Sequence, residues 1–440
     1  MTATSVVAAT SAIDSGSTAW MLTSSALVLL MVPGLALFYG GMVRRKNILT
    51  TMLHSFVAMA LIGVQWILVG YSLAFGESHG GLIGWSWDAV ALHGVTPDRL
   101  FSDKAIPLLA FVMFQGKFAI ITPALISGAI AERLKFSTYV VFILLWATFV
   151  YCPLAHWVWA PGGWLFEYGV LDFAGGTVVH ISAGVSALVL ALMIGPRRDY
   201  PDGAILPNNL TLTLTGAGLL WFGWFGFNAG SAVAVEHPVA GFSAALAFAT
   251  TQTAAASAAL VWLLIEWSQT GKPTSVGMAS GIVAGLVAIT PSCGAVNVVG
   301  ALVIGAVAGI LCALAVGLKY KLGYDDSLDV VGVHLVGGLI GTLMIGLVAA
   351  PESYNGVAGL FYGGGFDQLW RQAVGAGAVL LYSAVGTAIV ALIVKYTIGL
   401  RISEEDESSG IDDAEHAETG YDLAAASAGS SILARHGAEG

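Results

Sequence analysis

Two histidines lie inside long apolar stretches of the chain, where an ionisable side chain is costly and marks a candidate functional site. His180 ends the string that begins at Asp172, and His334 ends a shorter string that begins at Asp329. The pair could line a dry pore, or each imidazole could be hydrogen-bonded separately at a helix interface. No third ligand and no HExxH string accompanies them, which argues against a metal site. The matching positions of the two strings favour a pore.

An aromatic cluster between residues 221 and 231 is the second candidate. Trp224, Phe227, Asn228 and Ser231 follow i, i+3, i+4, i+7 spacing and share one helical face. Aromatic faces with one hydroxyl suit a small cation, held by cation–π attraction and a hydrogen bond. An aromatic belt at a membrane interface is the alternative. That alternative leaves the interleaved glycines and the aligned Asn and Ser unexplained.

Two further aromatic segments carry weaker signals. Phe114 and Phe118 stand at i, i+4 around Lys117, so they face either a pore or an ordinary helix-packing core. The segment from Tyr151 to Trp159 ends an apolar stretch, where aromatic residues typically anchor a helix at the membrane interface. For Trp157 the anchoring role is preferred.

The elements that position these residues follow from composition. Of 440 residues 57% are hydrophobic and 10% charged, with a mean hydropathy of +0.82. Soluble proteins carry roughly 25% charged residues, so a soluble enzyme, a nucleic-acid binder and a disordered protein are excluded. Three cysteines provide no disulfide framework. The sequence therefore predicts an all-α polytopic membrane protein, and the 56 glycines fit close helix packing in lipid.

Apolar runs long enough to cross a bilayer predict eleven transmembrane helices. They lie near 20–43, 49–75, 105–131, 137–155, 173–195, 208–234, 239–266, 275–291, 297–317, 329–350 and 370–399. Two glycine rows in these runs predict helix-packing seams without chemistry, namely Gly277, Gly281 and Gly285, and Gly305 and Gly309.

The placement of lysine and arginine predicts the orientation. With the N-terminus outside, three cationic residues fall outside (Arg99, Lys104 and Arg371), and Lys117 falls mid-span. The other thirteen lie on or near the cytoplasmic side: Arg44, Arg45, Lys46, Arg133, Lys135, Arg197, Arg198, Lys272, Lys319, Lys321, Lys395, Arg401 and Arg435. An N-out, C-in topology follows, and the first eighteen residues do not resemble a cleaved signal peptide.

The odd number of spans predicts an inverted five-plus-five repeat with one extra helix, with halves at about 20–200 and 205–395. Asp172 opens the fifth span from outside and Asp329 opens the tenth from inside. At 1.5 Å per residue, His180 lies roughly 12 Å and His334 roughly 7 Å from its aspartate. Both imidazoles are therefore expected towards the membrane midplane, approached from opposite faces.

The net charge of −10 belongs almost wholly to the C-terminal tail. Residues 403–440 hold ten acids against Arg435 alone, which leaves residues 1–402 close to neutral. Many acids and few aromatics beyond Tyr421 predict a solvated, partly disordered tail. The expected organisation is an extracellular segment at 1–19, a membrane domain at 20–402 and an acidic cytoplasmic tail at 403–440.

Six strings, in this order on eleven expected spans, resemble one family. They are AERLKF at 131–136, AHWVW at 155–159, LDFAGGTVVH at 171–180, GWFGFNAGS at 223–231, AITP at 288–291 and GVH at 332–334. The chain resembles the ammonium transporters of the Amt/Mep/Rh superfamily, of the microbial Amt type, from about Trp20 to Ile402.

The resemblance implies a homotrimer in the cell membrane, each subunit with its own hydrophobic pore for ammonium or ammonia and with no cofactor and no enzymatic activity. It implies that NH4+ is captured outside, deprotonated, and passed as NH3. Matched by motif, Trp159, Ser231 and Phe114 would form the external ammonium site, with Tyr151 nearby and Asp172 as a structural carboxylate beside it. Phe118 and Phe227 resemble the gate, His180 and His334 the pore pair, and Trp224 and Thr290 their supporting residues.

Some implications leave alternatives open. Lys117 departs from the pattern, and either turns from the pore to a polar partner or alters transport; the first is preferred because it lies about 100° from Phe118 on a helix. The family also implies regulation by a PII-type protein at the cytoplasmic tail. An ammonium sensor with weak or no transport is the alternative function, although the 38 residues after Ile402 are too few for a signalling domain. A membrane-embedded enzyme that uses the histidines is a third possibility, and the absence of a third ligand or of a carboxylate beside either histidine argues against it.

Overall fold

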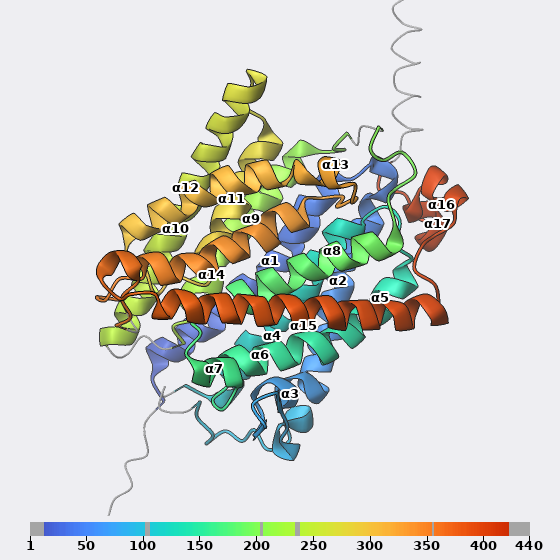
Figure 1. Ribbon diagram of the computed structural model, residues 1–440. Coiled ribbons are helices and arrows are strands. Elements are labelled where there is room, and N and C mark those ends of the chain that lie inside the picture. The colour runs from blue at the N-terminus through green and yellow to red at the C-terminus, as the bar shows by residue number, and fades with distance from the viewer. Residues whose placement is uncertain (1–12, 102–105, 203–205, 234–237, 354–355, 422–440) are drawn as a thin grey trace, which may run out of the picture.

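The structure, a computed structural model, describes residues 13–101, 106–202, 206–233, 238–353 and 356–421. It is nearly all helical, as predicted. The α-helices are α1 (Ser15–Met42), α2 (Ile48–Gln65), α3 (Tyr71–Phe75), α4 (Leu108–Ile130), α5 (Phe136–Trp146), α6 (Cys152–Trp159), α7 (Trp164–Tyr168), α8 (Ser182–Ile194), α9 (Leu210–Gly230), α10 (Pro238–Thr270), α11 (Ser275–Ile289), α12 (Val298–Ala315), α13 (Leu318–Leu322), α14 (Val336–Val348), α15 (Asp367–Thr397), α16 (Glu404–Ser409) and α17 (Ile411–His416). Helices α14 and α8 pack along α15, while α10 is steeply inclined to it (Figure 1).

Shorter elements interrupt or join these helices. The 3-10 segments are η1 (Arg45–Asn47), η3 (Trp87–Leu92) and η7 (Leu360–Tyr362). The π-helical segments are η2 (Trp66–Gly70), η4 (Ala147–Tyr151), η5 (Gly176–Ile181) and η6 (Val331–Leu335). Two antiparallel strands, β1 (Ser78–His79) and β2 (Ile83–Gly84), form a hairpin with Ser78 opposite Gly84.

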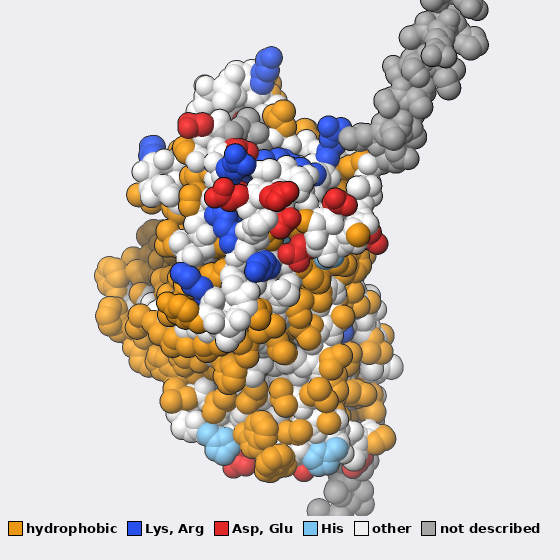
Figure 2. Space-filling model, turned by 90° about the vertical axis from the view of Figure 1, so that its right-hand side faces the viewer, with side chains coloured by type: hydrophobic (Ala, Val, Ile, Leu, Met, Phe, Trp, Pro, Cys, Tyr) orange, Lys and Arg blue, Asp and Glu red, His pale blue; other side chains and the backbone are white. Residues whose placement is uncertain are grey.

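Among the described residues, ten helical runs are long and apolar enough to cross a membrane. The remaining predicted span, at 275–291, corresponds to α11, which is apolar but has only 15 residues. The first span begins before the predicted residue 20, because the side chain of Asp14 accepts a hydrogen bond from Ser17 N and caps the helix. Figure 2 shows apolar side chains over much of the drawn face, with Lys, Arg, Asp and Glu gathered on one part of it.

The predicted glycine seams lie between α10, α11 and α12, which pack together. A Cβ at Gly281 would stand 2.9 Å from Ala259 Cα, and one at Gly305 would stand 2.4 Å from Ala254 O. The glycines therefore let these backbones approach closely, as small residues do in membrane helix packing.

A charged cluster closes one end of the bundle, formed by Arg44, Glu132, Arg197 and Asp325. Arg197 donates to Asp325 at 2.7 Å and to Glu132 at 3.2 Å, and Arg44 donates to Glu132 at 3.0 Å. Burial alone would raise the pKa of Glu132, but Arg197 and Arg44 offset that effect and hold this pKa below its usual value. The charged cluster thus ties the connections that follow α1, α4, α8 and α13.

Residues 403–421 are folded against the bundle, not disordered, although most of them are exposed as predicted. Their helices α16 and α17 lie at one end of the bundle (Figure 1), and Asp412 accepts hydrogen bonds from Leu49 N at 2.9 Å and Thr50 N at 2.8 Å. Asp412 therefore caps α2 from the other end of the chain. Glu407 accepts from Arg198 N at 2.8 Å and pairs with Arg401 at 2.6 Å. Composition alone could not show that the carboxylates of Asp412 and Glu407 are buried and accept hydrogen bonds from the backbone.

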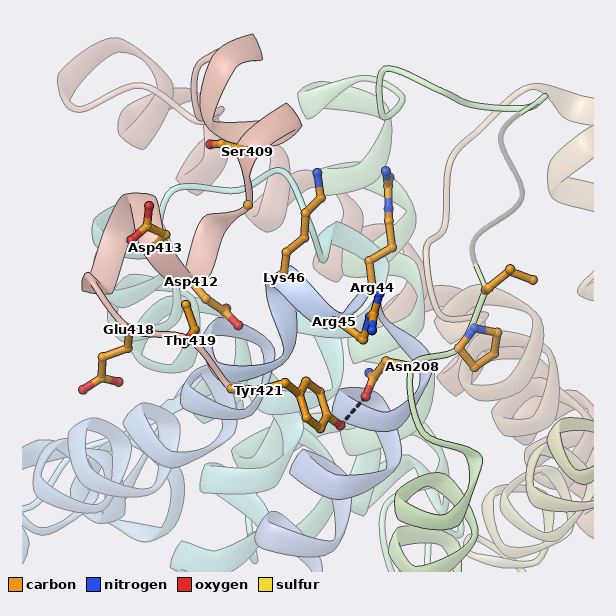
Figure 3. A pocket seen from close by; sticks show the side chains of 14 residues that line it. Arg44, Arg45, Lys46, Asn208, Ser409, Asp412, Asp413, Glu418, Thr419 and Tyr421 are labelled. Atoms are coloured by element: carbon orange, nitrogen blue, oxygen red, sulfur yellow. Dashed lines mark hydrogen bonds between the residues drawn. The ribbon is translucent and has the colours of Figure 1, made fainter. Parts of the chain in front are cut away.

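Tyr421 completes the docking of the tail. Its hydroxyl donates to Asn208 Oδ1 at 2.7 Å, at the floor of a cavity of about 690 Å³ between the tail and residues 44–46 (Figure 3). Residues 422–440, the rest of the predicted tail, lie outside the described residues.

Candidate functional site

His180 and His334 meet inside the bundle. Their Nδ1 atoms lie 3.2 Å apart, and their rings stack with centroids 5.4 Å apart at 22°. Both side chains are buried, and each comes from a π-helical segment, η5 for His180 and η6 for His334. π-turns are rare and occur frequently at functional sites. The sequence placed both residues in apolar spans, and the structure brings them together.

A glycine four residues after each histidine makes this meeting possible. A Cβ at Gly184 would stand 2.4 Å from Leu335 N, and one at Gly338 would stand 3.0 Å from Ile181 Cγ1. Leu335 and Ile181 each directly follow a histidine, so the two contacts are equivalent. The missing side chains let the two helices cross closely enough for the imidazoles to touch.

An aspartate eight residues before each histidine caps the N-terminus of the helical segment that carries the histidine. The carboxylate of Asp172 accepts from Gly175 N and Gly176 N, both at 2.7 Å, from Thr177 N at 2.8 Å and from Val178 N at 3.2 Å. The Thr177 hydroxyl also donates to it. These donors are the unpaired N–H groups of a helix N-terminus, so Asp172 acts as a cap.

The counterpart of Asp172 is Asp326, and the expectation of Asp329 in that place is wrong. Asp326 accepts from Val330 N at 3.1 Å and Val331 N at 2.7 Å. Asp329 instead adopts a left-handed backbone with φ of 62° and pairs with Lys319 at 2.6 Å. Burial is the main reason that the pKa of Asp326 is raised to about 6, with the nearby Asp329 adding to it.

A narrow cavity of about 10 Å³ adjoins the histidines. That volume is roughly what one water-sized molecule needs. Apart from the two histidines, apolar and aromatic residues line it: Met31, Leu35, Phe38, Ile121, Leu125, Val179, Leu220, Trp224, Phe227 and Val283. His180 Nε2 is buried and has no hydrogen-bond partner among the described residues, so it remains available to a small guest.

Two phenylalanine rings lie next to this cavity. Together with Trp159, Ser231 and the two histidines they form a row of side chains, called the column below. Phe118 of α4 and Phe227 of α9 pack with centroids 4.2 Å apart, and both are almost fully buried. Phe227 in turn lies 6.2 Å from the His180 ring. The two rings thus separate the cavity beside the histidines from Trp159.

On the other side of that pair lie Trp159 and Ser231, which are half-buried, and Phe114, which is fully buried. Trp159 at the end of α6 packs edge-on against Phe118 at 5.8 Å, while Phe114 lies 5.0 Å from Phe118. A Cβ at Gly230 would stand 2.9 Å from the Phe114 ring, so Phe114 reaches the residue before Ser231. The Ser231 hydroxyl donates to Phe227 O at 2.8 Å, which leaves its oxygen lone pairs free to accept.

Two buried polar contacts fix the aromatic rings around the column. Trp224 stacks on His180 at 5.5 Å, and its Nε1 donates to the Thr290 hydroxyl at 2.8 Å. Trp159 Nε1 donates to Asp172 O at 2.9 Å. Each indole N–H is therefore occupied by protein, and the ring face of Trp159 is the part left for a ligand.

Some sequence candidates lie outside this column. Tyr151 is fully buried, its hydroxyl has no partner among the described residues, and it makes no ring contact with Phe114 or Trp159. Asn228 donates to the Thr251 hydroxyl at 2.9 Å, which is a contact between α9 and α10. Lys117 is half-buried and does not line the cavity beside the histidines; the polar partner expected for it does not occur among the described residues.

The sequence reasoning missed Gly184, Gly338 and Asp326. Their signal was a shared spacing, since each histidine has an aspartate eight residues before it and a glycine four residues after it. Within the described ranges, no group of three or more His, Cys, Asp or Glu side chains could hold a metal ion.

Known proteins are similar to this chain in sequence and in architecture. The sequence profile of the Ammonium Transporter Family matches residues 19–421. An ammonium transporter of Mycobacterium tuberculosis is 57% identical over 442 residues, covering 94% of this chain and 92% of the relative. One from Aquifex aeolicus is 50% identical, with 93% and 94% covered.

Solved structures agree with the sequence matches. The crystal structure of Saccharomyces cerevisiae Mep2 superposes with a TM-score of 0.82 at 36% identity, covering 89% of this chain and 88% of that one. A structure described as a sensor Amt protein gives a TM-score of 0.82 at 32% identity, covering 91% and 98%. By profile, by identity across nearly its whole length and by fold, this chain belongs to the Ammonium Transporter Family.

Proposed function

We propose that the protein transports ammonium across the cytoplasmic membrane, capturing NH4+ and conducting NH3. The observation that carries the proposal is the continuous column from Trp159 and Ser231, through the Phe118–Phe227 pair, to His180 and His334. Along this column the Ser231 hydroxyl is followed by the apolar phenylalanine rings and then by the polar imidazoles. That order suits a cation that loses a proton on the way.

Capture takes place at the more accessible end, which we assign to the outside. The ring faces of Trp159 and Phe114 attract a cation through their π-electrons, and such contacts contribute about 0.5–2 kcal/mol. Ser231 supplies an acceptor for one N–H of NH4+, because its own hydrogen is directed to Phe227 O. Asp172 supports this site without binding the cation, since its carboxylate is used by five donors of the η5 start.

The Phe118–Phe227 pair is the gate. Moving an ammonium ion through it into an apolar cavity without hydrogen-bond partners would cost several kcal/mol or more, whereas neutral ammonia avoids most of that cost. Deprotonation therefore occurs at or before the gate. The same argument excludes potassium, which resembles ammonium in charge and size but has no proton to release.

The histidine pair then offers ammonia both kinds of hydrogen bond. Only one of the two facing Nδ1 atoms can carry the shared hydrogen when both rings are neutral. That ring presents a bare Nε2 to its surroundings, and the other ring presents an Nε2–H. Ammonia both donates and accepts, so it is matched by the pair, and it is reprotonated beyond it.

The remaining family properties are part of the proposal. The protein resides in the cell membrane with its acidic tail in the cytoplasm, forms a homotrimer, and is regulated by a PII-type protein at that face. The segregation of the charged cluster and the docked tail to one end of the bundle supports that orientation. A sensing role is the second candidate, supported by the neighbour described as a sensor Amt protein.

Proteoliposomes on a solid-supported membrane test the transport function. Ammonium pulses are expected to give a transient current or a change in internal pH, methylammonium a smaller response, and potassium none. Ser231→Ala is expected to weaken the apparent affinity about two- to tenfold, the value of one lost hydrogen bond. Responses no larger than in protein-free liposomes would contradict transport and favour sensing.

A further inference from the structure

His156 lies just outside the ammonium column, on the last turn of α6, three residues before Trp159. Its side chain is fully buried, although its neighbours belong to the exposed hairpin of β1 and β2 and to the turn after α6. Nδ1 lies 2.9 Å from Ala74 O, at the end of α3. Nε2 lies 2.8 Å from the Ser78 hydroxyl, and that hydroxyl lies 2.9 Å from Gly162 O.

The three contacts need more hydrogens than a neutral histidine provides. Ala74 O and Gly162 O can only accept, so Nδ1 must carry a hydrogen and Ser78 must direct its single hydrogen to Gly162. Nε2 must then carry a hydrogen as well, to donate to the Ser78 oxygen. A neutral imidazole has one N–H, whereas an imidazolium has two. The network is complete only when His156 is protonated.

The network encloses Trp159 on both sides in the sequence. His156 precedes it by one helical turn, and Gly162 follows it in a turn with φ of 84°. Trp157 Nε1 donates to Leu82 O at 2.7 Å, and Trp164 N donates to Gly81 O at 3.1 Å, so the hairpin is fastened to both ends of this segment. The hairpin backbone packs closely against the imidazole, because a Cβ at Gly84 would stand 3.0 Å from His156 Nδ1.

We propose that His156 is a positioning residue for Trp159 and that proton binding completes its network, fastening the hairpin and ordering the outer ammonium site. The inference rests on the proposed function, because it concerns the residue that captures NH4+. It predicts that the capture site binds ammonium more tightly in mildly acidic surroundings, in the range of about pH 5–8 where histidine titrates.

Other ionisable groups surround the network, some of them exposed and others buried. They are Glu77 and His79 on the hairpin, Tyr71 on α3, Glu167 on α7, Cys152 on α6 itself, and Asp172 and His180 towards the pore. Glu77, His79 and Glu167 are exposed, and the carboxylate of Asp172 is occupied by five donors. His79 supplies a comparison, since it adjoins Ser78 and makes no hydrogen bond in the network, while its charge repels a protonated His156.

Ammonium-induced currents measured between about pH 5.5 and about 8 test the inference. Ammonium stays almost entirely NH4+ in this range, so substrate protonation hardly changes. The apparent KM of the parent is expected to rise about fivefold towards the alkaline end, the value of roughly one net hydrogen bond, with little change in maximal current. His156→Gln is expected to flatten that profile, and His79→Gln to keep its amplitude with the midpoint moved to higher pH, because a charge that repels protonated His156 is lost.

Two further measurements keep the test decisive if His156→Gln folds poorly. Ser78→Ala retains the imidazole but removes the third contact, and is also expected to flatten the KM profile. Hydrogen exchange of the 76–86 segment, corrected for intrinsic rates, is expected to rise with pH in the parent and in His79→Gln but not in Ser78→Ala. Equal pH profiles for the parent, His156→Gln and Ser78→Ala would overturn the inference, whereas no ammonium response from the parent at any pH would overturn the transport function instead.

Discussion

His180 and His334 face each other through their Nδ1 atoms at 3.2 Å, although 154 residues separate them in the chain. The same local features are repeated around the two residues. Each histidine has a capping aspartate eight residues before it, a π-helical segment around it and a glycine four residues after it. The repeat therefore predicts which substitutions disturb the pore pair without touching it.

Gly184→Ala is expected to impair transport by pushing the histidine helices apart. The new Cβ would stand 2.4 Å from Leu335 N, and backbone cannot move aside as a flexible side chain can. Overpacking of this kind costs about 1–3 kcal/mol. Gly377→Ala on α15 is the control, because nothing lies within 4 Å of its Cβ position. Thermal unfolding and ammonium currents are measured for both; equal behaviour of the two variants would contradict the close crossing.

Asp326→Ala is expected to destabilise the protein by about 1–3 kcal/mol, since it leaves Val330 N and Val331 N without their acceptor. Asp329→Asn should cost much less. Its side chain is 29% exposed and its ion pair with Lys319 is correspondingly weak, while asparagine tolerates the left-handed backbone at this position. The unfolding temperatures of the two variants decide the matter, and a larger loss in Asp329→Asn would restore Asp329 as the cap.

The charged cluster predicts a pH dependence. The pKa values of Glu132 and Asp325 are below their usual range, since their arginine partners offset the effect of burial. Carboxyls with lowered folded-state pKa values stabilise the fold above their unfolded values of about 4, and that stability is lost as the pH falls further. Arg197→Gln is expected to cost about 3–5 kcal/mol and to shift the loss to higher pH.

Hydrogen exchange of the segment around residues 195–199, followed from neutral to acid pH, measures that shift. Arg45→Gln is the matched control, because the Arg45 side chain is exposed and makes no hydrogen bond within the described residues. If both variants lose protection at the same pH as the parent, the ion pairs do not hold this end of the bundle.

Asp412→Ala is expected to release the tail. It removes the acceptor for Leu49 N and for both the N–H and hydroxyl of Thr50, and caps of this kind contribute about 0.5–2 kcal/mol. Limited proteolysis within residues 403–421 should therefore become several-fold faster. Asp413→Ala changes the neighbouring, exposed carboxylate and should cut at the parental rate. Equal rates for the two variants would show that the tail is held by other contacts.

Local patterns were sufficient to predict most of the fold. Length and hydropathy determined where the chain can cross a membrane, and these properties are local, so the spans were found within a few residues. The i, i+4 spacing of Phe114 and Phe118 also predicted one shared face, and both rings do meet in the column.

Partners from distant parts of the chain explain the errors. Asp329 directly precedes an apolar run, so it resembled a cap, but its left-handed backbone turns it aside and the cap comes from Asp326. Composition predicted a partly disordered tail because it could not reveal that Asp412 meets the N–H groups at the start of α2. Both errors concern donors and acceptors that only the folded chain brings together.

The most direct test of ammonium deprotonation compares ammonium with potassium in proteoliposomes that contain the parent or the double variant His180→Ala, His334→Ala. The amount of reconstituted protein and its oligomeric state are matched before measurement. The parent is expected to respond to ammonium and not to potassium, while the double variant loses most of its ammonium response or begins to admit potassium. An unchanged ammonium response with unchanged exclusion of potassium in the double variant would contradict a role for the facing histidines in selecting and conducting ammonia.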